Sequence, residues 1–96
     1  MDITEFQKRL GASFALKTDG PAFQLQLDQV VESPQAPTGY ACFSAEFIGP
    51  AQPVLPQATY CLIGEDVMLE LFLVPIERQS QGIRYQAIFN QKRDPA

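Results

Sequence analysis

The longest apolar stretch of the chain, residues 67–76, is interrupted by one charged side chain, Glu70. It is too short to span a bilayer, which needs about 20 apolar residues, and its composition favours a strand. Side chains alternate across a strand, so one face would be wholly aliphatic, formed by Val67, Leu69, Leu71 and Leu73. The other face would carry Met68, Glu70, Phe72, Val74 and Ile76. We predict that the aliphatic face lies in the core and that the mixed face reaches water or a partner.

Strand-like patterns recur along the rest of the chain, at residues 13–17, 23–28, 40–48, 59–63 and 83–90. Turn-forming glycine and proline residues separate these segments. A break in the alternation at Val30-Val31 indicates a bulge or a strand end near Gln29. The alternation assigns to the core Phe23, Leu25, Leu27, Phe43, Phe47, Leu69, Leu71, Leu73, Tyr85 and Phe89. No crossover helix separates the strands, so neighbouring strands are expected to be antiparallel.

A short helix is predicted over about residues 3–10. Asp2 can cap this helix, and a glycine follows its end. Ile3, Phe6 and Leu10 would then form one apolar stripe. A helix of this length does not persist alone in water, so the stripe is expected to dock on the β-structure.

These elements predict one domain and one fold class. The 96 residues are expected to form a single β-domain (1–96), with the helix at about 3–10, β-structure at 13–90 and a frayed tail at 91–96. The predicted class is all-β, a small antiparallel β-barrel or sandwich of about six strands with a short N-terminal α-helix. A domain of this size can bury a core without metal or disulfides.

The charge and residue content exclude several function classes. A net charge of −4 argues against nucleic acid, whose binders need a basic face. The chain has no histidine, the commonest general base and metal ligand, and no nucleotide-binding or nucleophile motif. Glu65-Asp66 lacks the spacing of a calcium loop. We therefore expect no enzymatic activity, no cofactor and no metal.

The N-terminus indicates a location. It is acidic and polar, unlike a signal peptide, so we expect a cytoplasmic protein that does not enter membranes. Thiols stay reduced in that compartment.

The mixed face of the apolar stretch is the candidate partner-binding surface, formed by Phe72, Val74, Ile76 and Glu70. Two covers are open for this face. The N-terminal helix could dock its stripe there, or a partner subunit could, because a large exposed apolar face marks an interface. Glu70 is expected to reach the rim of the face or to pair with Arg78 or Arg84.

The two cysteines give an expectation about strand order. If residues 40–48 and 58–63 form an antiparallel hairpin, the register that brings their aromatic side chains together places Cys42 opposite Cys61. Opposed Cβ atoms in such a pair are about 4.5–5.5 Å apart, and a disulfide needs about 3.8 Å. We therefore expect neighbouring but reduced thiols.

Four segments together resemble a family of small, uncharacterised bacterial proteins grouped as a domain of unknown function. They are Phe47-Ile48-Gly49-Pro50, Gln57-Ala58-Thr59-Tyr60 with Leu62, Leu71-Phe72-Leu73-Val74-Pro75-Ile76 and Tyr85-Gln86-Ala87-Ile88-Phe89-Asn90. The resemblance covers about residues 40–90 and implies a small β-domain, often found beside phage-tail-collar-like proteins. Family members often carry a histidine where this chain has Gly64-Glu65, so any role of that histidine is absent.

Two functions follow as expectations. The first is a non-enzymatic protein-interaction or assembly domain, which binds a protein partner or itself and which the resemblance connects to phage-tail-like or fibre structures. The alternative is a small ligand-binding β-barrel in which Tyr40, Tyr60 and Tyr85 line a pocket. A monomer with an internal cavity would favour the alternative.

Overall fold

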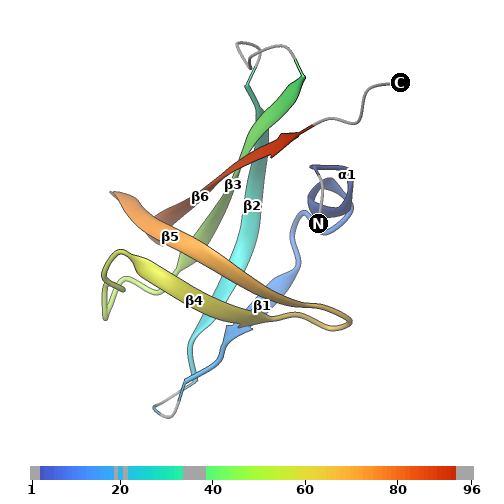
Figure 1. The fold of residues 1–96 in the computed structure, drawn as a ribbon. Helices are drawn as coiled ribbons and strands as arrows, with labels where there is room; N and C mark the ends of the chain where they lie inside the picture. The colour runs from blue at the N-terminus through green and yellow to red at the C-terminus, as the bar shows by residue number, and fades with distance from the viewer. Residues whose placement is uncertain (1–2, 19, 21, 34–38, 93–96) are drawn as a thin grey trace.

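The computed structural model describes residues 3–18, 20, 22–33 and 39–92. Its elements are α1 (Ile3–Gln7), β1 (Ser13–Leu16), β2 (Gln24–Glu32), β3 (Tyr40–Gly49), β4 (Ala58–Ile63), β5 (Met68–Gln79) and β6 (Gly82–Lys92) (Figure 1). The expected cap Asp2 and the end of the predicted tail, from residue 93, lie outside the described residues.

The six strands close into a ring in the order β1-β2-β3-β6-β5-β4 (Figure 1). Every neighbouring pair in this ring is antiparallel. This confirms the all-β, antiparallel prediction, and the closed ring is the barrel rather than the sandwich. The expected irregularity in the second strand is also present, as a register shift between Leu27 and Gln29 where β2 pairs with β3.

The predicted hairpin between the third and fourth strands is wrong. β3 pairs with β2 and β6, whereas β4 pairs with β1 and β5. Cys42 consequently faces Asn90, and Cys61 faces Glu70. The loop between β3 and β4 does not simply reverse the chain, because Leu55 within it is buried and its backbone N–H bonds to Tyr85. That anchor leads the chain from β3 to the far side of the ring.

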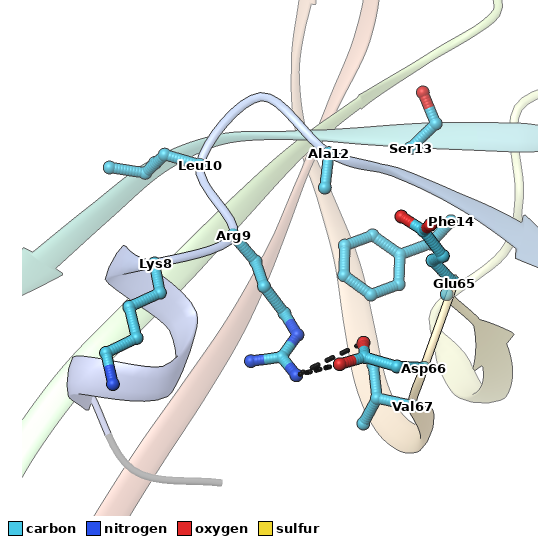
Figure 2. Close-up of a pocket in the computed structure, with 10 residues that line it drawn as sticks. Lys8, Arg9, Leu10, Ala12, Ser13, Phe14, Glu65, Asp66 and Val67 are labelled. Carbon is cyan, nitrogen blue, oxygen red and sulfur yellow. Dashed lines mark hydrogen bonds and ion pairs between the residues drawn. The ribbon is translucent and has the colours of Figure 1, made fainter.

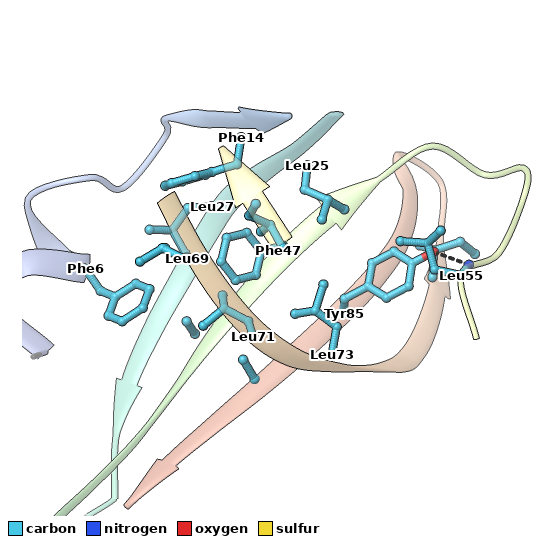
Figure 3. Close-up of a cluster of buried hydrophobic side chains, with 14 of the residues drawn as sticks. Phe6, Phe14, Leu25, Leu27, Phe47, Leu55, Leu69, Leu71, Leu73 and Tyr85 are labelled. Atoms are coloured by element: carbon cyan, nitrogen blue, oxygen red, sulfur yellow. Dashed lines mark hydrogen bonds between the residues drawn. The ribbon is translucent and has the colours of Figure 1, made fainter. Parts of the chain in front are cut away.

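Side chains fill the interior of the ring. The predicted core residues are buried, except that Phe89 is only partly buried. Phe14, Phe47, Leu27 and Leu71 converge from different strands (Figure 3), and the rings of Phe14 and Phe47 meet edge to face at 5.8 Å between centroids. This packing supplies the hydrophobic stabilisation of the fold.

Helix α1 closes the gap where β5 and β6 separate. Their paired residues end at Val74 and Gln86, and the two strands then diverge towards the side where α1 lies (Figure 1). Phe6 is only 1% exposed, and its ring lies 5.0 Å from that of Phe89. The helix ends at Gln7, earlier than predicted. Leu10 therefore leaves the expected stripe and is 49% exposed.

Tyr85→Phe is expected to lower the free energy of unfolding by about 1–3 kcal/mol, the cost of leaving a buried hydrogen-bonding group unsatisfied. The Tyr85 hydroxyl accepts a 2.8 Å hydrogen bond from the buried backbone N–H of Leu55. Urea denaturation measures the change. Tyr60→Phe is the control, because the Tyr60 hydroxyl donates to the Pro56 carbonyl in an exposed position. Equal losses in the two variants would contradict the assignment of the buried bond.

Candidate interaction surface

The four predicted partner-binding residues all lie on the outer side of β5. Leu69, Leu71 and Leu73 point into the ring, so the alternate positions point outward. Phe72 is 51% exposed, Ile76 is 43% exposed and Glu70 is exposed, while Val74 is partly buried beside Gln86. The predicted division of this strand into a core face and an outer face is confirmed.

The helix does not cover this surface, and that expectation is wrong. Phe6 of α1 is buried against Phe43 and Phe89 on the inner side of the ring. The Phe6 ring is almost wholly buried where β5 and β6 separate, so the helix gains its hydrophobic stabilisation there. Phe72 and Ile76 therefore keep their exposure in the folded chain.

The apolar surface extends from β5 to its neighbour β4. Ile63 of β4 lies opposite Met68, and Thr59 lies opposite Phe72. Met68 is 64% exposed and Ile63 is 41% exposed. We call this surface the β4–β5 face, formed by Thr59, Cys61, Ile63, Met68, Glu70 and Phe72 side by side and by Ile76 further along β5, beyond the end of β4. The sequence pattern missed Ile63, because its place beside Met68 follows only from the pairing of the two strands.

Glu70 does not pair with the arginines expected for it. Arg84 donates instead to Asp28 at 2.7 Å and to Glu46 at 2.9 Å. The hydrogen bond to Asp28 raises the pKa of Arg84, against the opposing effect of burial. No ion pair joins Glu70 to Arg78 within the described part of the chain. Glu70 is thus an exposed carboxylate inside an apolar surface.

A hollow of about 550 Å³ lies between the end of α1 and the turn from β4 to β5. Lys8 and Arg9 line one side, Glu65 and Asp66 line the other, and the ring of Phe14 faces it (Figure 2). Arg9 bonds to Asp66 at 3.2 Å and to Glu5 at 3.1 Å, and the bond to Glu5 is the main cause of its raised pKa. Most of the charged groups that line the hollow are paired, and the ion pair between Arg9 and Asp66 links the end of the helix to the turn.

The other candidate groups do not form a common site. Tyr85 is buried and bonded to Leu55, whereas Tyr40 is exposed at the opposite end of β3 from the residue that pairs with Tyr85. Tyr60 is partly buried, and burial raises its pKa. Among the described residues, no group of three or more potential ligands is placed to hold a metal ion. None of the described helices is long and apolar enough to cross a membrane.

A family model matches residues 1–89, which include α1, the first five strands and most of β6. The chain belongs to the family described as Domain of unknown function (DUF6916). This agrees with the resemblance found in the sequence to a domain of unknown function. Neither a curated protein nor a solved structure matches this DUF6916 domain.

Proposed function

We propose that this DUF6916 domain is a non-enzymatic protein-interaction or assembly domain of the cytoplasm, and that the β4–β5 face is its docking surface. The observation that carries the proposal is the exposure of Met68, Phe72, Ile76 and Ile63 on two adjacent strands. Scattered apolar residues are normal on protein surfaces, whereas a contiguous group marks an interaction site. The family resemblance connects such assembly to phage-tail-like or fibre structures.

The packed interior supports this proposal over a ligand-binding barrel. Tyr85, Phe47, Leu27 and Leu73, from four different strands, are all fully buried within the ring. A small-molecule site is usually a preformed concave cavity with a few polar groups, and these side chains occupy the space where it would lie. The absence of histidine from the chain supports an interaction domain over an enzyme.

Phe72→Asp is expected to abolish partner binding while leaving the ring folded, because it places a charge at the centre of the β4–β5 face. The test is co-purification of the tagged full chain from its native host, followed by identification of the bound proteins. Val31→Asp is the matched control, since Val31 is 40% exposed on β2, across the ring from β5. Circular dichroism checks that both variants fold.

A partner retained by the wild type and by Val31→Asp, but lost by folded Phe72→Asp, would support the proposal. The same set of proteins on all three chains, or no bound protein on any of them together with a monomeric wild type, would contradict it.

A further inference from the structure

A carboxylate and an ammonium group flank the middle of β4 on the outer surface. Cys61 of β4 lies opposite Glu70 of β5. On the other side of β4, the backbone N–H of Lys17 bonds to the carbonyl of Cys61 at 2.9 Å, directly after β1. Lys17 therefore continues the pairing of β1 with β4, one residue beyond Leu16 and Leu62. Glu70, Cys61 and Lys17 form one row across three strands.

All three members of this row belong to the outer surface. Leu62 is fully buried, so its neighbours Cys61 and Ile63 point outward. Ala15 pairs with Ile63 and is exposed, and Lys17 follows it by two residues and is also exposed. Neighbouring strands are about 4.7–4.9 Å apart, so the backbone positions of Glu70 and Lys17 lie about 10 Å apart with a small cysteine between them.

This row distinguishes between the ways in which two copies could meet face to face. In such a pair the two-fold axis lies in the plane between the facing sheets. An axis parallel to β4 exchanges its two flanking strands, so Glu70 of each copy meets Lys17 of the other. An axis perpendicular to β4 would set Glu70 against Glu70 and Lys17 against Lys17, which is repulsive.

The side chains around the row also differ in length. In the row itself the small Cys61 lies on β4 between the long Glu70 and Lys17, and Phe72 flanks the small Thr59, whereas Ile63 of β4 is large. Long side chains on the flanking strands extend past a short one between them, so they can reach a facing copy. Met68 and Phe72 are 64% and 51% exposed, and they supply the apolar area around the two ion pairs.

We propose that two copies of this chain pack through the surface of β1, β4 and β5 about a two-fold axis parallel to β4, joined by two reciprocal Glu70–Lys17 ion pairs. The proposal rests on the proposed function and names a second copy as the partner. It also explains the position of Glu70, because the carboxylate inside the apolar face meets a cation when the face is covered.

Charge reversal tests the pairing, with the dimer dissociation constant measured by analytical ultracentrifugation. Lys17→Glu or Glu70→Lys alone places like charges together at two positions, so either is expected to weaken the dimer about tenfold or more. The double variant Lys17→Glu/Glu70→Lys restores both pairs and is expected to return the constant close to that of the wild type. Lys8→Glu, which makes the same charge change at an exposed lysine outside this face, is the control.

Thiol cross-linking tests the position of the axis. Cys61 of one copy faces Cys61 of the other copy across the axis, and facing sheets pack about 10 Å apart. A short bis-maleimide is therefore expected to join the Cys42→Ser variant into a covalent dimer. The Cys61→Ser variant keeps Cys42 and is expected to stay uncoupled, because Cys42 lies on β3, away from this face.

A strict monomer, a dimer that couples through Cys42, or a double variant as weak as the single ones would each overturn the proposal. None of these results would overturn the proposed function, since a monomer can still bind a different chain through the face that Phe72→Asp disrupts. If the wild type binds no protein other than a second copy of itself, the dimer is the assembly.

Discussion

Leu71→Ala is expected to lower the free energy of unfolding by about 2–5 kcal/mol, the range for removing a buried leucine side chain from a packed core. Leu71 is 5% exposed and lies on the inner side of β5, opposite Tyr60. The loss combines the transfer of apolar atoms to water with the cavity that the neighbouring side chains leave unfilled. Urea denaturation at low protein concentration measures it without a contribution from association.

Phe72→Ala provides the control for Leu71→Ala. The two residues are adjacent on one strand, but Phe72 is 51% exposed on the outer side. Surface substitutions usually change stability by less than about 0.5 kcal/mol. Leu71→Ala is therefore expected to lower the free energy of unfolding more than Phe72→Ala, although leucine is the smaller side chain. A loss below about 1 kcal/mol for Leu71→Ala would mean that the faces of β5 are reversed.

Gly82→Ala is expected to lower the free energy of unfolding by about 2–6 kcal/mol, for two reasons that act together. Gly82 has a φ of +138°, a conformation that costs other residues about 1–3 kcal/mol. A Cβ atom at this position would also lie only 2.0 Å from the backbone oxygen of Gly49. Backbone must move to relieve that contact, and overpacking of this kind costs about 1–3 kcal/mol.

Gly11→Ala separates the two causes. Gly11 has a φ of +88°, but a Cβ atom there would meet nothing within 4 Å. Only the conformational cost remains, so we expect a loss of about 1–3 kcal/mol. The comparison uses thermal or urea unfolding of both variants. Equal losses at the two glycines would show that the close approach of Gly82 to Gly49 does not contribute.

The strands and their faces could be predicted from the sequence because alternation is a local property. The buried positions of Leu25, Leu27, Phe43 and Phe47 follow from residue spacing alone. Even the register shift after Leu27 leaves a local sign, as the break in alternation that follows it. The charge of Glu70 within an apolar run likewise predicted that its face would not be core.

The strand order could not be predicted, because alternation does not say which strands meet. Aromatic pairing favoured β3 beside β4, but the anchor of Leu55 on Tyr85 leads the connecting loop elsewhere. The docking place of the helix was hidden for the same reason. An apolar stripe indicates that a helix docks, whereas the gap that receives Phe6 exists only once β5 and β6 have separated.

The candidate interaction surface was thus predicted only in part. Phe72 and Ile76 could be assigned to it from the alternation of one strand. Ile63 and Lys17 join it through the pairing of β4 with β5 and with β1, which brings together residues far apart in the chain. Long-range pairing of this kind has no local signal in a single sequence.

The joint between β1 and β4 is the weakest seam of the ring. Among the described residues, its pairs are Ala15 with Ile63 and Leu16 with Leu62, continued by the hydrogen bond from Lys17 to Cys61, whereas β3 pairs with β6 along its whole length. Pairing β1 with β4 closes a longer stretch of chain than forming a hairpin does. The loss of conformational entropy therefore opposes this step more strongly than it opposes hairpin formation. During folding the other strands can assemble as an open, curled sheet, and the seam is then the natural last step and the natural first point of opening.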